Sequence, residues 1–108
     1  MWIRLGTFRV KAGQLEQLRA TYNERAVPKV RSHRGNIGCL LLEPAAPEDD
    51  QFIACTIWAS RADGDAYESS GAAQEVIGFL RDHFAGPPTL KSYESHSAFI
   101  LEPPSTKR

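Results

Sequence analysis

The chain has 108 residues, of which 42% are hydrophobic, and its thirteen basic and thirteen acidic residues give a formal net charge of zero. This length predicts one domain with one core, and the neutral charge gives no support for binding nucleic acid. No apolar run is long enough to span a membrane, and the N-terminus lacks the apolar stretch of a signal peptide, so we expect no membrane contact and a cytoplasmic location.

The two cysteines, Cys39 and Cys55, belong to no Cys-x-x-Cys or Cys/His cluster, so no metal site is predicted. Both lie in apolar, strand-like runs, and we interpret them as small core residues. If the two runs form a hairpin, the thiols could face each other, which leaves a redox role open.

The first third of the chain predicts a strand followed by a long helix. Alternating side chains indicate a strand over residues 2–10. A helix is predicted over residues 13–31 because apolar residues recur there at steps of three and four. This stripe consists of Leu15, Leu18, Tyr22 and Ala26. Pro28 has no backbone N–H, so it should kink or end the helix.

Two further strands are predicted over residues 37–43 and 51–59. The loop between them is rich in proline and acidic residues, so the pair should form an antiparallel hairpin.

The last part of the chain predicts two helices and a strand. Ser60 should cap a short helix that ends near Ser69, and Ser70-Gly71 should cap another that runs to Phe84. The final strand is predicted over residues 89–101.

This order of elements predicts an α+β fold, a ferredoxin-like split βαβ arrangement with a four-stranded antiparallel sheet. The helices can cover only one sheet face, and too many large side chains are present for all to face them. These are Trp2, Phe8, Leu40, Leu42, Phe99 and Leu101. We therefore expect a homodimer in which two sheets pack face to face as a dimeric α+β barrel. The domain should cover residues 1–101, and residues 102–108 should be a disordered tail.

Two neighbouring segments carry a family resemblance. They are Ile57-Trp58-Ala59-Ser60-Arg61-Ala62-Asp63 and Tyr67-Glu68-Ser69-Ser70-Gly71. Together they resemble the signature of the antibiotic-biosynthesis-monooxygenase-like family, in which a strand ends in Trp, a capped short helix follows and a Ser-containing turn opens the next helix. The segment from Phe84 to Tyr93 is similar to the family's approach to its last strand.

The resemblance covers most of residues 1–101 and implies several activities. The family holds cofactor-independent oxygenases of polycyclic phenols or quinols, haem-degrading enzymes and members without known activity. The haem-degrading members use an Asn on the first strand, the Trp, and a His on the helix after the Ser turn. Only Trp58 matches that pattern here, since the only histidine on the helix, His83, comes more than a turn too late. The resemblance therefore does not imply haem degradation.

We expect a ligand pocket between the sheet and the helices, with Trp58 as one aromatic wall. The alternative for Trp58 is a core residue that closes the end of the sheet. Packing also accounts for Tyr22, which lies on the helix stripe. The predicted pocket residues are Trp58, Tyr22, Ile77, Leu80 and Phe84, and the candidates for catalytic proton handling are His83 and Tyr67.

These residues favour a small monooxygenase that oxidises an aromatic or quinol substrate without a bound cofactor. The alternative is a dimer, non-catalytic or stress-related, that binds a small aromatic ligand without converting it. The two hypotheses differ in whether an ionisable group points into the pocket, because oxygenation needs a substrate anion and simple binding does not.

Overall fold

The computed structural model describes residues 1–100; Leu101 and the predicted disordered tail over 102–108 lie outside the described residues. The elements are β1 (Trp2–Phe8), α1 (Leu15–Thr21), η1 (Tyr22–Ala26), α2 (Val27–Arg31), β2 (Asn36–Leu42), β3 (Phe52–Trp58), α3 (Arg61–Ser69), α4 (Ala72–Leu80), η2 (Arg81–His83) and β4 (Thr89–Glu94).

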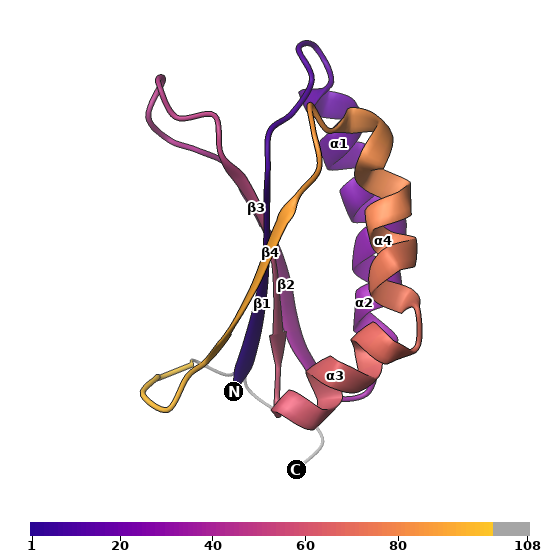
Figure 1. Cartoon of the computed structure of the whole chain (residues 1–108), viewed down its shortest axis with the longest axis vertical. Coiled ribbons are helices and arrows are strands. Elements are labelled where there is room, and N and C mark those ends of the chain that lie inside the picture. Colours follow the sequence, from indigo (N-terminus) through magenta and orange to yellow (C-terminus); the bar gives the residue numbers. More distant parts are fainter. Residues whose placement is uncertain (101–108) are drawn as a thin grey trace, which may run out of the picture.

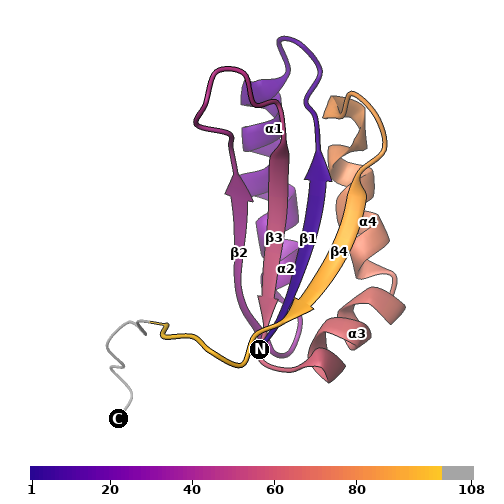
Figure 2. The same cartoon turned by 60° about the vertical axis from the view of Figure 1, so that its left-hand side comes forward.

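The four strands form one sheet in the order β2-β3-β1-β4, and all neighbouring strands are antiparallel. Within the described residues, all helices lie on one side of this sheet, and no helix covers the other side (Figures 1 and 2). The predicted ferredoxin-like α+β fold is confirmed.

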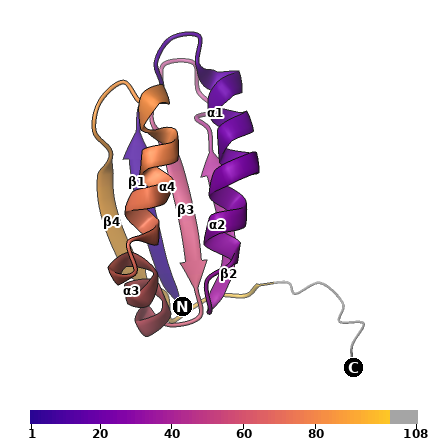
Figure 3. The ribbon, with the colours of Figure 1, turned by 90° about the vertical axis from the view of Figure 1, so that its right-hand side faces the viewer.

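The first helix runs through Pro28 rather than ending there. Its middle turn, η1, is a π-helix in which the Val27 N–H bonds to the carbonyl of Tyr22. This wider turn lies just before Pro28, where the proline ring would clash with the carbonyl four residues earlier. The π-helical turn therefore accommodates Pro28 without ending the helix. The helix lies beside α4 on the sheet (Figure 3).

Short-range capping starts both later helices. The Ser60 hydroxyl accepts a hydrogen bond from the Asp63 N–H at 3.2 Å, as predicted. The Ser70 hydroxyl donates to the Tyr67 carbonyl at 2.8 Å and accepts from the Ala72 N–H at 3.2 Å. Gly71 has φ of 88°, a conformation that favours glycine, and this turns the chain sharply from α3 into α4.

The last strand is shorter than predicted and ends at Glu94. Within residues 1–100, strand β4 pairs only with β1, and the N–H of Ser95 bonds to the carbonyl of Met1. Phe99 lies beyond the end of this strand, outside the sheet, and its side chain is exposed.

The side of the sheet turned away from the helices, here called the open face, is apolar. Leu40, Leu42 and Tyr93 lie on it, each close to half exposed. Of the large side chains that were expected not all to face the helices, Trp2 and Phe8 do face them, because the register of β1 turns both that way.

The two cysteines do not face each other. Cys39 pairs with Thr56 on the helix-facing side, whereas Cys55 pairs with Leu40 on the open face. Both thiols are free, so the structure contains no disulfide between them.

No helix within residues 1–100 is long and apolar enough to cross a membrane.

Candidate functional site

On the helix-facing side of the sheet, strands β3, β1 and β4 present four rows of side chains, defined by the strand register. From one end to the other they are Phe52–Phe8, then Ala54–Gly6–Leu90, then Thr56–Arg4–Ser92, then Trp58–Trp2–Glu94. On β1 and β3 the side chains of the two middle rows are small or polar, and those of the rows on both sides are aromatic. A gap is therefore expected over the middle rows, where little side-chain volume rises to meet the helices.

A cavity of about 250 Å³ lies there. The two middle rows form its floor, and α3 and α4 form its roof. The roof residues are Tyr67, Glu68, Ala73, Val76 and Ile77. Most of this lining is apolar, which is typical of a small-molecule site.

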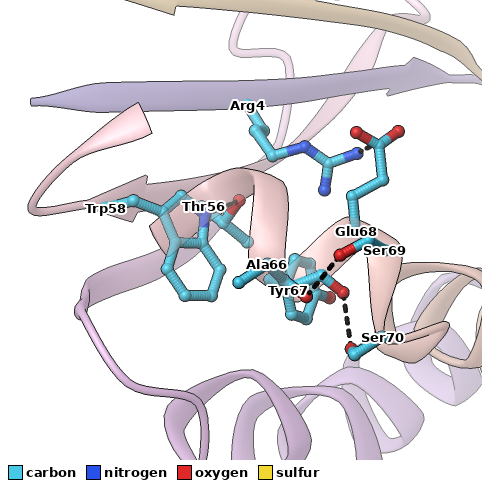
Figure 4. A network of polar contacts seen from close by, with 8 residues as sticks. All are labelled: Arg4, Thr56, Trp58, Ala66, Tyr67, Glu68, Ser69 and Ser70. Atoms are coloured by element: carbon cyan, nitrogen blue, oxygen red, sulfur yellow. Dashed lines mark hydrogen bonds and ion pairs between the residues drawn. The ribbon is translucent and has the colours of Figure 1, made fainter. Parts of the chain in front are cut away.

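One of the residues that line the cavity, Arg4, carries a positive charge. The side chain of Arg4 is only 14% exposed, and its Nη2 lies 3.5 Å from Glu68 Oε2. Its Cζ is 5.6 Å from the centre of the Tyr67 ring. Figure 4 shows the guanidinium reaching from β1 toward α3 between these two residues. Glu68 is about half exposed, so water weakens its attraction to Arg4. The shielded guanidinium can therefore also interact strongly with an anion in the cavity.

Tyr67 lines the cavity and is itself buried. One side of its ring packs on Trp58, with centroids 4.8 Å apart, and His33 meets it edge-on at 5.2 Å. Burial raises the pKa of Tyr67 to about 12, although the nearby Arg4 acts in the opposite direction. At neutral pH its phenol is therefore protonated and can serve as a hydrogen-bond donor rather than as a base.

Trp58 is completely buried and does not line the cavity, so the structure supports the interpretation of this residue as core. Its indole N–H donates to the Thr56 hydroxyl oxygen at 2.9 Å. Thr56 does line the cavity, and this bond leaves its O–H free to donate to a ligand. Trp58 thus acts on the cavity through Thr56 instead of forming a wall.

The other predicted pocket residues also divide into one that lines the cavity and three that belong to the core. Ile77 lines the cavity, whereas Tyr22, Leu80 and Phe84 belong to the core cluster around Phe8. Burial raises the pKa of the Tyr22 hydroxyl, which keeps it protonated inside this core.

His83 lies away from the cavity, near the start of the first helix. Its Nδ1 is 2.9 Å from Gln14 Oε1, and its Nε2 is 3.4 Å from Thr21 Oγ1. Both ring nitrogens thus have partners in a helix-to-helix contact, and His83 is not among the residues that line the cavity. Of the two candidate proton-handling residues, the structure brings only Tyr67 to the cavity.

Sequence reasoning missed Arg4, Thr56, Glu68 and Gly6. A signal was present for two of them, since strand alternation places Arg4 and Gly6 on the same face as Trp2 and Phe8. A lone charged residue on an otherwise apolar strand face points to a polar site beneath the helices. Within residues 1–100, no group of three or more His, Cys, Asp or Glu side chains is arranged to hold a metal ion.

Comparison with solved structures supports the fold. A protein from Nitrosomonas europaea, provisionally described as an antibiotic biosynthesis monooxygenase, superposes with a TM-score of 0.70 at 17% identity, over 90% of this chain and 100% of the other. Proteins from Bordetella bronchiseptica and Deinococcus radiodurans with the same provisional description both give a TM-score of 0.72. The first is 18% identical over 87% of this chain and 95% of its own, and the second is 17% identical over 95% and 100%.

Such identities establish the fold alone. No curated protein matches the sequence significantly. The model of the antibiotic biosynthesis monooxygenase family matches residues 1–78, which include β1, the Trp58 strand and the helices over the cavity up to Gly78. Since this match covers well over half of the 108 residues, the chain belongs to the antibiotic biosynthesis monooxygenase family.

Proposed function

We propose that this protein is a monooxygenase that oxidises a small hydroxylated aromatic molecule, a phenol or a quinol, with O₂ and without a bound cofactor. The observation that carries the proposal is the guanidinium of Arg4, which lies within a largely apolar cavity beside the hydroxyl-bearing residues Tyr67 and Thr56.

Oxygenation without a cofactor requires the substrate itself to supply electrons. A phenol does this readily only as its phenolate, so the site must favour loss of the phenolic proton. A fixed cation that is itself largely shielded from water, as the Arg4 side chain is, lowers the free energy of that anion. Arg4 takes this role, with Tyr67 and Thr56 as neutral donors to the same oxygen.

Glu68 is the candidate base in place of His83. Its carboxylate lies beside Arg4 and is about half exposed, so it can take the phenolic proton and release it to solvent.

The reaction is balanced without an outside reductant. The phenolate transfers one electron to O₂, and the resulting radicals combine to form a C–O bond at a ring carbon that carries hydrogen. The peroxide anion formed in this way takes up one proton, which replaces the phenolic proton released earlier. The resulting hydroperoxide then loses water, which breaks the O–O bond and removes the hydrogen from the ring carbon. The net reaction converts a phenol and O₂ into a quinone and water, and each product receives one of the two atoms of O₂.

Oxygen uptake with 1-naphthol tests the proposal. The wild type should consume O₂ with one atom of ¹⁸O₂ in the quinone product, and Arg4→Gln should lower kcat roughly 100-fold. Arg81→Gln, an exposed arginine on η2, is the matched control and should keep full activity. If the wild type binds naphthol but never consumes O₂, the alternative of a non-catalytic binding protein replaces this proposal.

We also propose that the protein acts as a homodimer through the open face. Three large apolar side chains there, Leu40, Leu42 and Tyr93, are close to half exposed. A contiguous apolar sheet face is costly in water, and a second copy with the same neutral charge can cover it without electrostatic repulsion.

A further inference from the structure

Two residues on the cavity floor, Gly6 and Leu90, determine how much room a ligand has. They lie side by side in the strand register, with Gly6 on β1 and Leu90 on the edge strand β4. A methyl group placed at Gly6 would stand 3.3 Å from Leu90 Cδ2 and 3.9 Å from the carbonyl oxygen of Ala54. The missing side chain of Gly6 therefore provides depth, and the end of Leu90 borders that space.

The cavity opens toward β4. Its exposed lining residues are Glu68 at the end of α3 and Leu90, Lys91 and Ser92 on β4, whereas Tyr67 and Ala73 on the opposite side are buried. Leu90 is 53% exposed, so its side chain has solvent on one side into which it can rotate. A ligand that enters at this edge passes Leu90 before it reaches Gly6.

The volume limits the number of fused rings. A cavity of about 150 Å³ holds one benzene ring. The cavity of about 250 Å³ therefore has room for a second fused ring, but not for a third while Leu90 stays in place.

We propose that Gly6 and Leu90 are specificity-determining residues that restrict this site to hydroxyarenes of one or two fused rings. Gly6 is the fixed limit, because a Cβ there would take space from the floor itself. Leu90 is the adjustable limit, because its displacement lengthens the cavity toward solvent. The hydroxyl group of the ligand follows from the proposed function; the size limit follows from the geometry of these two residues.

Equilibrium binding without oxygen tests the size limit separately from turnover. The probes are phenol, 2-naphthol and 2-hydroxyanthracene, and the variants are Gly6→Ala and Leu90→Ala. Gly78→Ala is the matched control, because Gly78 lies on the exposed side of α4 and an added Cβ meets nothing within 4 Å. Melting curves establish folding, which Gly6→Ala should retain because the nearest atom is the flexible end of a side chain.

The wild type and Gly78→Ala should bind 2-naphthol most tightly of the three probes. Gly6→Ala should weaken 2-naphthol at least tenfold and change phenol little, and Leu90→Ala should tighten 2-hydroxyanthracene at least tenfold. If neither variant changes the order of the three affinities, the inference is wrong while the proposed function stands. A wild type that binds none of the three overturns both.

Discussion

Trp58 and Thr56 stand two residues apart on β3, and the indole N–H of Trp58 donates to the Thr56 hydroxyl at 2.9 Å. Only Thr56 reaches the cavity. Through this bond the core residue Trp58 affects the cavity, because the bond determines which way the hydroxyl hydrogen of Thr56 can point.

Truncation of Trp58 should strongly destabilise the fold. The side chain is fully buried, so Trp58→Ala should lower the free energy of unfolding by about 3–5 kcal/mol. Thr56→Val keeps the shape but leaves the buried indole N–H without an acceptor, which should cost about 1–3 kcal/mol. Urea denaturation measures both free energies. The double variant of Trp58→Phe with Thr56→Val should be destabilised by less than the sum of the losses for Trp58→Phe alone and Thr56→Val alone. A stable, fully folded Trp58→Ala would show that the residue is not core.

A charge on the open face should separate the proposed dimer. Light scattering of the wild type at micromolar concentration should give about twice the chain mass of 12.0 kDa. Leu40→Glu should give a folded monomer, because Leu40 is 48% exposed in the single chain but would be buried against a second sheet. Ala20→Glu, at an exposed position on α1, is the control and should remain dimeric. A wild type that stays monomeric at high concentration would rule out the barrel.

The ion pair between Arg19 and Glu43 should make stability depend on acid pH. Two hydrogen bonds of 2.8 and 2.7 Å from the guanidinium lower the pKa of Glu43. The stabilisation is therefore fully present above the ordinary carboxyl pKa and is lost as pH falls through the lowered value. Glu43→Gln should melt below the wild type at pH 7, and the difference should shrink at pH 3. A difference that does not change with pH would mean that the pair contributes through packing alone.

The two thiols should react independently. Burial raises the pKa of Cys55, and the cysteines lie on opposite faces of the sheet. Alkylation of the denatured, unreduced protein should add two labels per chain, because both thiols are free. In the native protein Cys55 should be labelled slowly, since little thiolate forms and a dimer would cover it. Recovery of labels only after reduction would show a disulfide that this fold does not permit within one chain.

Haem should not bind at this site. None of the cavity-lining residues among residues 1–100 is a histidine, and His83 is held by Gln14 elsewhere in the fold. Titration with haemin should give no saturable Soret shift at low micromolar concentration. Tight one-to-one binding, with loss of the Soret band on reduction, would contradict this expectation.

Local patterns in the sequence were sufficient for the elements and their order. The Ser60 cap is formed with the N–H of Asp63, three residues away, so it could be predicted without any knowledge of the fold. Strand alternation likewise assigns Arg4 and Gly6 to one face, and the Trp58 segment carries the family resemblance that the family match confirms.

Only the tertiary structure decided which of these residues meet. His83 looked available as an acid–base group, yet it contacts Gln14, 69 residues earlier in the chain. The cavity depended on a register that aligns Gly6 with Ala54 and Leu90. The physical reason is that caps and side-chain alternation arise from interactions over a few residues, whereas a cavity is space left between strands and helices distant in sequence, and depends on how their side chains pack.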